Sequence, residues 1–291
     1  MITVRIKGGL GNQLFQYAAA YALAKRLNQD VRLDISFYPN QTLRGYKLEY
    51  LNIEKSEIAN KFPLSISFLK NRYINKGLRM LHVSTIGKHP LYLLETLSDI
   101  VPQYYSVNSN DIYIDGYYQS EKYFKEYKNE LIKQFSQNYN PEKEYLECLD
   151  EIKRTTSIAV HLRRGDFLKA QYNNNPNHYL LGEEYYQNSR EFVEKKVDNP
   201  TFFWFSDDIE WVQHHFDRRD NFRFVTMRTK HPDIDELMLM KNCKHIIAAN
   251  STFSWWASWL NENTDAMHIC PAKRYGNANM IPDNWIKISV E

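Results

Sequence analysis

The chain has 291 residues, of which 43% are hydrophobic and 25% are charged, so it is a globular protein long enough for two domains. A formal net charge of +2 is too small to indicate a nucleic-acid-binding surface. The three cysteines, Cys148, Cys243 and Cys270, lack the spacing of a metal site and are odd in number, which argues against a disulfide framework and for a reducing compartment.

The amino-terminal residues and the hydropathy of the chain indicate its cellular compartment. Residues 1–6 have no signal-peptide profile, and no apolar run approaches the length that spans a membrane. We therefore expect a cytoplasmic protein.

The amino-terminal residues predict a strand-turn-helix-strand unit. Its elements are a strand (2–6), a glycine-rich turn (7–12), a helix (13–27) and a second strand (31–35). The turn can present backbone N–H groups to an anion. It is neither a P-loop nor a dinucleotide fingerprint, because Leu14 stands where the third glycine after Gly9 and Gly11 would be. Asn12 and Gln13, at the start of the helix, are the more specific feature.

A basic segment follows between Glu57 and Glu95. It contains six Lys or Arg and no Asp or Glu, a formal charge of +6, and predicts helices with long connections. Apolar residues interleave with Lys70, Arg72, Lys76 and Arg79, as in an amphipathic helix. Such a helix either lies on the anionic inner face of a membrane or packs into its own domain with its basic side chains solvated. We favour the packed helix.

The middle of the chain predicts a domain boundary. Residues 112–120 are predicted to form a strand that opens onto a loop, and 121–135 a helix. The polar stretch 138–144 contains Pro141 and leads to the boundary. We expect one domain over residues 1–150 and a second over 151–291.

The second half predicts a doubly wound α/β domain with a parallel sheet, because strands and helices alternate regularly. The strands are predicted at 157–162, 201–205, 222–226, 245–249 and 266–270, and the helices at 183–197, 209–216, 234–242 and 252–261. Polar residues collect after three of the strands, at 161–166, 206–208 and 250–252. Because parallel strands end at one edge of the sheet, these clusters are expected to line one cleft.

Arg163 and Arg164 are the central feature of this cleft. Two adjacent arginines at the end of a buried strand are costly unless an anion meets them, and the guanidinium fork matches a phosphate. The alternative is a structural ion pair with Asp166. The first interpretation is favoured.

Other polar residues of the second half have two interpretations each. Ser251 can cap a helix, present that helix start to a phosphate, or do both. Asp207 and Asp208 either cap a helix, which we favour, or accept hydrogen bonds from the edge of a guanine. Asp233 and Asp235 match a metal-binding D-x-D pattern but follow Pro232, so we interpret them as capping residues and expect no metal.

Four segments together resemble the bacterial α-1,2-fucosyltransferases of glycosyltransferase family 11. They are Gly8–Ala18, His161–Phe167, Ser206–Asp208 and Asn250–Trp256, and Gly116–Phe124 is similar to a fifth family segment. The segments occur in the family's order over nearly the whole chain. Any one of them alone would be unspecific.

The resemblance implies a GT-B type α/β fold, with two Rossmann-like domains facing across a cleft. The amino-terminal domain would bind the acceptor and the carboxy-terminal domain the donor. The implied reaction is an inverting, metal-independent transfer of L-fucose from GDP-β-L-fucose to the 2-hydroxyl of a terminal galactose, in an O-antigen or other surface oligosaccharide. No cofactor and no nucleic acid are implied.

The resemblance also assigns roles to individual residues. Arg163 matches the arginine that binds the β-phosphate of the donor, and Asp166 is the nominal base, with a dissociative route that uses no base as an equal alternative. The remaining residues implied in donor binding are Gly11, Asn12, Gln13, His161, Arg164, Asp207, Asp208, Ser251, Thr252, Phe253 and Ser254. The competing hypotheses are a GT-B transferase with another donor or linkage and a noncatalytic module that binds nucleotide sugars or glycans.

Overall fold

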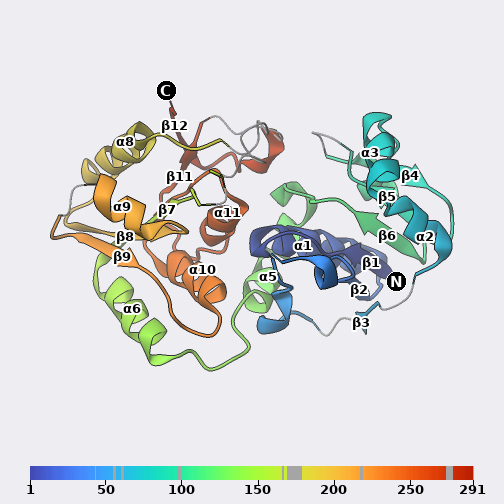
Figure 1. Cartoon of the computed structure of the whole chain (residues 1–291), viewed down its shortest axis with the longest axis horizontal. Coiled ribbons are helices and arrows are strands. Elements are labelled where there is room, and N and C mark those ends of the chain that lie inside the picture. The colour runs from blue at the N-terminus through green and yellow to red at the C-terminus, as the bar shows by residue number, and fades with distance from the viewer. Residues whose placement is uncertain are drawn as a thin grey trace. The chain divides into compact units, whose positions relative to one another are not determined.

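The structure is a computed structural model (Figure 1). It describes residues 1–291 except 43, 55–56, 60–61, 97–99, 166, 169–178, 217–218, 273–277 and 291. The chain divides into two compact units, one of residues 1–138 with 276–282 and one of residues 139–275 with 283–291. Residue 150, where we expected the first domain to end, lies inside helix α6 (Lys143–Arg154), which contacts β7 (Thr156–Leu162) in the second unit.

The first unit is built on a six-stranded sheet in the order β3-β2-β1-β6-β5-β4, with every neighbouring pair parallel except β4 and β5. Its strands are β1 (Ile2–Arg5), β2 (Val31–Asp34), β3 (Glu57–Ile58), β4 (Thr85–Ile86), β5 (Leu91–Leu94) and β6 (Ile112–Asp115). Its α-helices are α1 (Leu10–Leu27), α2 (Leu64–Leu69), α3 (Arg72–Met80), α4 (Pro102–Ser106) and α5 (Lys128–Gln134). Short 3₁₀ helices occupy Tyr38–Asn40, Leu48–Tyr50, Glu121–Tyr123, Lys125–Tyr127 and Ala278–Met280.

The predicted strand-turn-helix-strand unit is confirmed, and α1 begins three residues earlier than expected. Its five alanines are all buried, which lets the helix pack closely against β1 and β2. The predicted helix over 121–135 is wrong in its first half, where two 3₁₀ helices precede α5. Strands β3, β4 and β5 lie in the basic segment, where the sequence predicted helices only.

Two basic side chains of the basic segment point into the protein and not, as expected, into solvent. Lys70 Nζ lies 2.6 Å from Asp34 Oδ2, and Arg79 Nη2 lies 3.7 Å from Asp115 Oδ1. Both carboxylates are fully buried. The expectation that the basic side chains are solvated is therefore wrong for Lys70 and Arg79, because each compensates a carboxylate at the end of a buried strand.

Asp115, the last residue of β6, is the centre of this buried network. Arg5 Nη1 lies 2.8 Å and Lys7 Nζ 2.6 Å from its carboxylate. Burial alone would raise the pKa of Asp115, but Lys7 and Arg5 outweigh that effect and hold the pKa well below its ordinary value. Two neutral donors complete its shell, the Tyr92 hydroxyl at 2.6 Å and the Asn75 amide at 3.1 Å.

Replacing Asp115 should destabilise the first unit strongly. Asp115→Ala leaves Arg5 and Lys7 without their buried counter-charge, which typically costs about 3–5 kcal/mol in free energy of unfolding. Denaturant unfolding of the purified variant measures this loss. Asp150→Ala is the matched control, because the Asp150–Arg154 pair is exposed and its removal should cost no more than about 0.5 kcal/mol. A decrease in the free energy of unfolding below 1 kcal/mol for Asp115→Ala would contradict the conclusion that the buried network stabilises the first unit.

The second unit contains a six-stranded, entirely parallel sheet in the order β12-β11-β10-β7-β8-β9. Besides β7, its strands are β8 (Pro200–Ser206), β9 (Phe222–Val225), β10 (His245–Ile247), β11 (His268–Pro271) and β12 (Ile286–Ile288). Besides α6, its helices are α8 (Glu183–Glu194), α9 (Ile209–His215), α10 (Pro232–Asn242) and α11 (Thr252–Trp259). The predicted parallel, doubly wound sheet is confirmed, and β12 is an additional strand.

The two faces of β7 point to different helices. Ile158, Val160 and Leu162 belong to a buried core with side chains from α8 and α9. Residues between them point to the opposite face, where the His161 ring lies 5.6 Å from that of Phe253 in α11. The sheet is therefore covered on both faces, as an all-parallel sheet requires.

Two further observations concern the whole described chain. No helix in the ranges that the structure describes is both long and apolar enough to cross a membrane. Cys148, Cys243 and Cys270 form no disulfide among the described residues, and the last two are buried.

Candidate functional site

Three loops of the second unit meet at the carboxyl edge of its sheet. Strand β7 pairs in parallel with β8 on one side and with β10 on the other. The residues that follow these strands, Arg163, Asp207 and Ala248, therefore emerge at the same edge. This is where open α/β sheets bind ligands. The expected convergence of the three polar clusters is thus present within this unit.

The Asp207 carboxylate ties the first two loops together. Its Oδ1 accepts hydrogen bonds from the backbone N–H groups of Arg164, at 2.9 Å, and Gly165, at 3.0 Å. Its Oδ2 lies 3.1 Å from Arg163 Nη1. Burial raises the pKa of Asp207, but Arg163 and the two backbone N–H groups outweigh burial and leave the pKa below its ordinary value. Asp207 is therefore an anion that positions the turn carrying both arginines.

Arg164 is held by a second aspartate and by an aromatic ring. Its Nε lies 3.2 Å from Asp208 Oδ2, and its guanidinium carbon lies 4.2 Å from the ring centroid of Trp211. Asp208 also caps α9, because its Oδ1 accepts from the backbone N–H of Trp211. Capping, the favoured interpretation, is confirmed for Asp208. Asp207 instead bonds Arg163 and the turn after β7.

Both arginine side chains reach the surface of this edge. The side chain of Arg163 is 19% exposed and that of Arg164 is 23% exposed. The expected alternative of a structural pair through Asp166 lies outside the described residues. The carboxylates of Asp207 and Asp208 orient the two arginines at a place where an anionic ligand can reach them.

His161 lies beneath the arginines and is neutral. Its side chain is 3% exposed. Burial lowers its pKa, and Arg163 lowers it further against the opposing effect of Asp207. Its Nδ1 has no hydrogen-bond partner among the residues that the structure describes. His161 therefore packs under the site as an uncharged ring.

The third loop ends at the amino terminus of α11. The Ser251 hydroxyl caps this helix by accepting from the backbone N–H of Phe253 at 3.2 Å. The hydroxyl of Ser254 is fully buried and accepts from the backbone N–H of Ala249 at 3.1 Å. Ser251, Thr252 and Phe253 are partly exposed at the helix start. The buried Ser254 hydroxyl thus holds the loop before α11, whereas Ser251, Thr252 and Phe253 border the site.

Glu236 is a site residue that sequence reasoning missed. It lies on α10, and one carboxylate oxygen accepts from the backbone N–H of Met227, just after β9, at 3.3 Å. Burial raises its pKa to about 7, with smaller contributions from Asp233, Asp207 and Asp235. An acid with a pKa near neutrality therefore lies on α10, hydrogen-bonded to the loop after β9, the fourth strand that ends at this edge. A glutamate in the first turns of a helix gives no sequence signal of this, because such residues are common at helix starts.

The shift of Glu236 predicts a pH-dependent stability difference. A carboxyl whose pKa is higher in the folded state stabilises the fold below its unfolded pKa, and this contribution is lost as the pH rises through about 7. The free energy of unfolding of the wild type, relative to Glu236→Gln, should therefore fall between pH 4.5 and pH 8, by roughly 3 kcal/mol. Urea unfolding across this range measures it. Exposed Glu130→Gln is the control, and a flat difference for Glu236→Gln would contradict the assignment.

The predicted site residues of the first unit lie at the carboxyl end of β1. Gln13 is fully buried and binds the loop around residues 45–47, donating to Gly45 O at 2.8 Å and accepting from the backbone N–H of Lys47 at 2.9 Å. Asn12 Oδ1 accepts from Gln119 Nε2 at 2.8 Å. Gly11 is buried within α1. Gln13 therefore has a structural role, and Asn12 with Gln119 is the polar pair at this edge.

A glycine in the preceding turn makes room for this pair. Gly8 has a φ of +83°, and a β-carbon there would lie 2.8 Å from the Asn12 amide nitrogen. A side chain at Gly8 would therefore both strain the backbone and displace Asn12. A glycine is therefore required at position 8 by the tight geometry of the turn.

Asp233 and Asp235 lie in the first turn of α10. Asp235 is fully buried and accepts hydrogen bonds from the hydroxyls of Tyr139, at 2.6 Å, and Thr229. Its carboxylate thus binds neighbouring loops, a role beyond the capping that we expected. Within the described part of the chain, no group of three or more His, Cys, Asp or Glu side chains could hold a metal ion.

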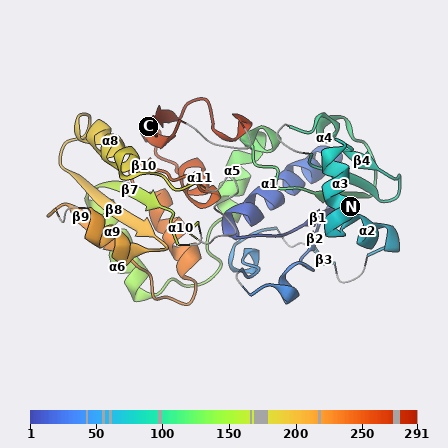
Figure 2. The same cartoon turned by 45° about the horizontal axis from the view of Figure 1, so that its top comes forward.

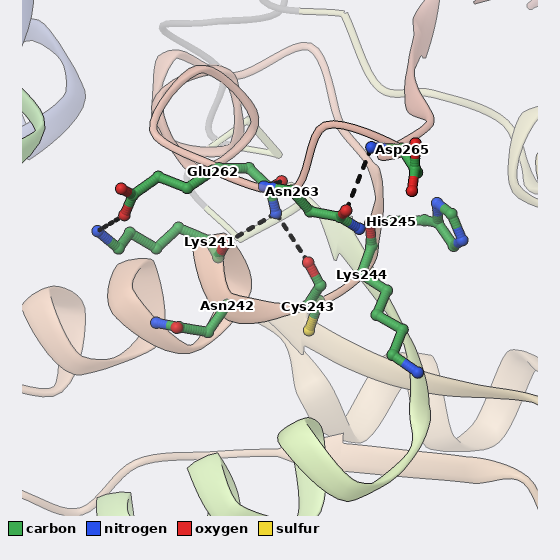
Figure 3. Close-up of a pocket in the computed structure, with 9 residues that line it drawn as sticks. Lys241, Asn242, Cys243, Lys244, His245, Glu262, Asn263 and Asp265 are labelled. Atoms are coloured by element: carbon green, nitrogen blue, oxygen red, sulfur yellow. Dashed lines mark hydrogen bonds and ion pairs between the residues drawn. The ribbon is translucent and has the colours of Figure 1, made fainter. Parts of the chain in front are cut away.

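A surface hollow of the second unit lies at the opposite end of β10 (Figure 3). Its polar groups largely satisfy one another: Asn261 Nδ2 donates to the carbonyls of Lys241 and Cys243, and Lys241 lies 3.9 Å from Glu262. Since His245 begins β10, this hollow lies at the amino edge of the strand. We therefore place the candidate site at the carboxyl edge instead, with the paired arginines.

The two units, each a Rossmann-like open sheet flanked by helices, have the architecture of a GT-B type glycosyltransferase, and the family model assigns that enzyme class. More specifically, the chain belongs to the family described as "Glycosyl transferase family 11", whose model matches residues 1–288. It is 32% identical to an "Alpha-1,2-colitosyltransferase" of Escherichia coli over 99% of both chains. It is 28% identical to the "O-antigen biosynthesis glycosyltransferase WbnK" of Escherichia coli, covering 97% of this chain and 99% of that one.

Among solved structures, the chain is similar to NodZ α-1,6-fucosyltransferase, from Bradyrhizobium, in a crystal soaked with GDP-fucose. The TM-score is 0.48, the sequence identity 15%, and the match covers 89% of this chain and 91% of that one. The family model confirms the expected family and enzyme class, and the two Rossmann-like α/β units confirm the expected fold class.

Proposed function

We propose that this protein is an inverting galactoside α-1,2-fucosyltransferase that uses GDP-β-L-fucose and needs no metal. Its acceptor is the 2-hydroxyl of a terminal galactose in an O-antigen or other surface oligosaccharide. The observation that carries the proposal is the pair Arg163 and Arg164, fixed by Asp207 and Asp208 at the carboxyl edge of the second sheet. This arrangement suits a diphosphate, and the family supplies the sugar chemistry.

A second candidate differs in the donor sugar alone. The relative named as an α-1,2-colitosyltransferase aligns with 99% of this chain at 32% identity. Colitose differs from L-fucose by lacking the 3-hydroxyl group. Discrimination between the two sugars therefore depends on whether a polar group of the site bonds that hydroxyl, because an unpaired buried polar group strongly disfavours the deoxy analogue.

The proposed chemistry centres on the leaving group. As the bond between fucose and GDP breaks, negative charge grows on the β-phosphate, and a preorganised cation there lowers the barrier. Arg163 supplies the cation, Arg164 stands beside it, and the start of α11 adds backbone N–H groups with the hydroxyl of Ser251. Asp207 acts as a positioning residue, because its two oxygens already bind Arg163 and the turn after it.

The other residues of the proposed donor site have narrower roles. His161 is neutral and buried, so it supports the nucleoside side of the site by packing rather than by charge. Thr252 and Phe253 border the diphosphate, and the resemblance to the family assigns Asn12 a role in donor binding. The acceptor hydroxyl loses a proton as it attacks. Asp166 is the proposed base, and a dissociative route without a dedicated base is the alternative.

The transfer reaction itself is the direct test. The protein is incubated with GDP-fucose or GDP-colitose and with β-galactoside acceptors, and the product linkage is determined by NMR. We expect fucose transfer to the galactose 2-hydroxyl with inversion at the anomeric carbon. Transfer of colitose but not fucose would favour the second candidate, and another linkage or no reaction with either donor would contradict the proposal.

Replacing Arg163 should almost abolish transfer. Arg163→Ala removes the guanidinium that meets the developing phosphate charge, and such losses are typically on the order of a thousandfold. Arg163→Lys should rescue little, since an ammonium lacks the planar fork. Initial rates at saturating donor measure both, with exposed Arg154→Ala as the control. An Arg163→Ala rate above a tenth of wild type would rule out the assigned role.

Chelation should leave the rate unchanged. Arg163, Arg164 and the start of α11 provide the positive charge that a divalent ion supplies in other transferases. Rates are compared with EDTA and with added Mg²⁺ or Mn²⁺. Loss of activity in EDTA that one divalent ion specifically restores would contradict the metal-independent mechanism.

A further inference from the structure

Helix α3 turns two of its polar side chains inward, while apolar side chains of both α2 and α3 are exposed. On α3, Asn75 and Arg79 reach the buried carboxylate of Asp115. Tyr73 and Met80 of the same helix are 81% and 64% exposed. The two helices lie side by side on the first unit in both views (Figures 1 and 2). The buried charge network has therefore reversed the usual amphipathic orientation of α3.

The outward apolar side chains form one cluster along residues 64–81. On α2, Leu64 is 89% and Phe68 is 61% exposed, and Leu81, just after α3, is 75% exposed. Outside this cluster, the most exposed large apolar side chain among the described residues is Leu146, at 50%. Single exposed apolar residues need no explanation, but a cluster of this kind marks an interaction surface.

The charges around the cluster have one sign. Lys70 and Arg79 form ion pairs with buried carboxylates, whereas Arg72, Lys76 and Lys88 are exposed. None of these three pairs with a carboxylate in the part of the chain that the structure describes. The sequence has no Asp or Glu between Glu57 and Glu95, so no acid of this segment itself neutralises these charges.

We propose that this α2–α3 surface docks on a lipid bilayer that contains anionic phospholipids. It comprises Leu64, Phe68, Tyr73, Met80 and Leu81 with the basic residues Arg72, Lys76 and Lys88. The apolar side chains enter the boundary between headgroups and acyl chains, and the basic ones meet the phosphates. Membrane docking is independent of the transfer reaction proposed above.

A bilayer suits this surface better than a second copy of the chain. In a two-fold symmetric dimer the same patch occurs on both sides of the interface. Arg72, Lys76 and Lys88 would then be brought together from both copies, and like charges across an interface are unfavourable. Anionic headgroups provide the opposite charge without this cost.

Vesicle co-sedimentation of the full chain tests the proposal. We expect binding to vesicles that contain phosphatidylglycerol and at least tenfold weaker binding to pure phosphatidylcholine. Binding should weaken as salt is raised from 50 to 500 mM, because salt screens headgroup attraction. Equal binding to both lipids, or no binding to phosphatidylglycerol at 50 mM salt, would overturn the proposal.

Two sets of variants locate the surface. Changing Arg72, Lys76 and Lys88 to Gln should lower the partition coefficient on the order of 100-fold. The control changes three exposed lysines elsewhere to Gln and removes the same charge. The control positions are Lys125, Lys153 and Lys195.

The apolar set changes Leu64, Phe68 and Leu81 to Ser, and it should weaken binding at least tenfold. Its control changes three exposed leucines of the second unit, Leu146, Leu168 and Leu180, to Ser. Lys70 and Arg79 stay unchanged, because they stabilise the fold. Circular dichroism melting checks that each variant is folded.

The outcomes separate a membrane surface from its alternatives. If a variant set and its control lost vesicle binding equally, the proposal would be overturned. Binding would then not depend on the α2–α3 surface. Sedimentation equilibrium of the protein without lipid tests the second copy. A wild-type dimer that the apolar set converts to monomer would assign the surface to self-association instead, whereas a monomer in all variants supports the bilayer.

Discussion

The candidate site depends on one carboxylate, that of Asp207. It binds the guanidinium of Arg163 and two backbone N–H groups of the turn after β7, so it joins the loops after two neighbouring strands. Without this anion, Arg163 and the backbone N–H groups would lose their partners at the end of a buried strand. The same contact keeps both arginines at the carboxyl edge of the sheet. In the proposed mechanism, this ion pair orients the cation before any ligand arrives.

The two units use the carboxyl edges of their sheets differently. In the first unit, Asp34 and Asp115 at this edge are fully buried and compensated by Lys70, Arg5 and Lys7. In the second unit, Arg163 and Asp207 are partly exposed. Buried, mutually satisfied charges hold a fold together, whereas partly exposed charges can still exchange partners with a ligand. The compensation in the first unit also turns the apolar side of α3 outward.

The sequence was sufficient for the second unit's fold and for part of its site. Strands and helices alternate there regularly, and arginines after a β-branched strand indicate an anion site whatever the family. The role of Asp207 could not be predicted, because it joins residues 43 positions apart through backbone N–H groups. Glu236 gave no signal for a similar reason, since its shifted pKa arises from burial. Strands β3, β4 and β5 have two to four residues each and depend on partners distant in sequence.

A crystal structure of the protein with GDP tests the central claim most directly. The account predicts that the β-phosphate lies about 2.7–2.9 Å from the guanidinium of Arg163, with the start of α11 beside it and the Asp207 contacts to the turn retained. GDP bound elsewhere, for example in the hollow lined by Lys241 and Glu262, would contradict it. So would GDP at the carboxyl edge with Arg163 still directed only at Asp207.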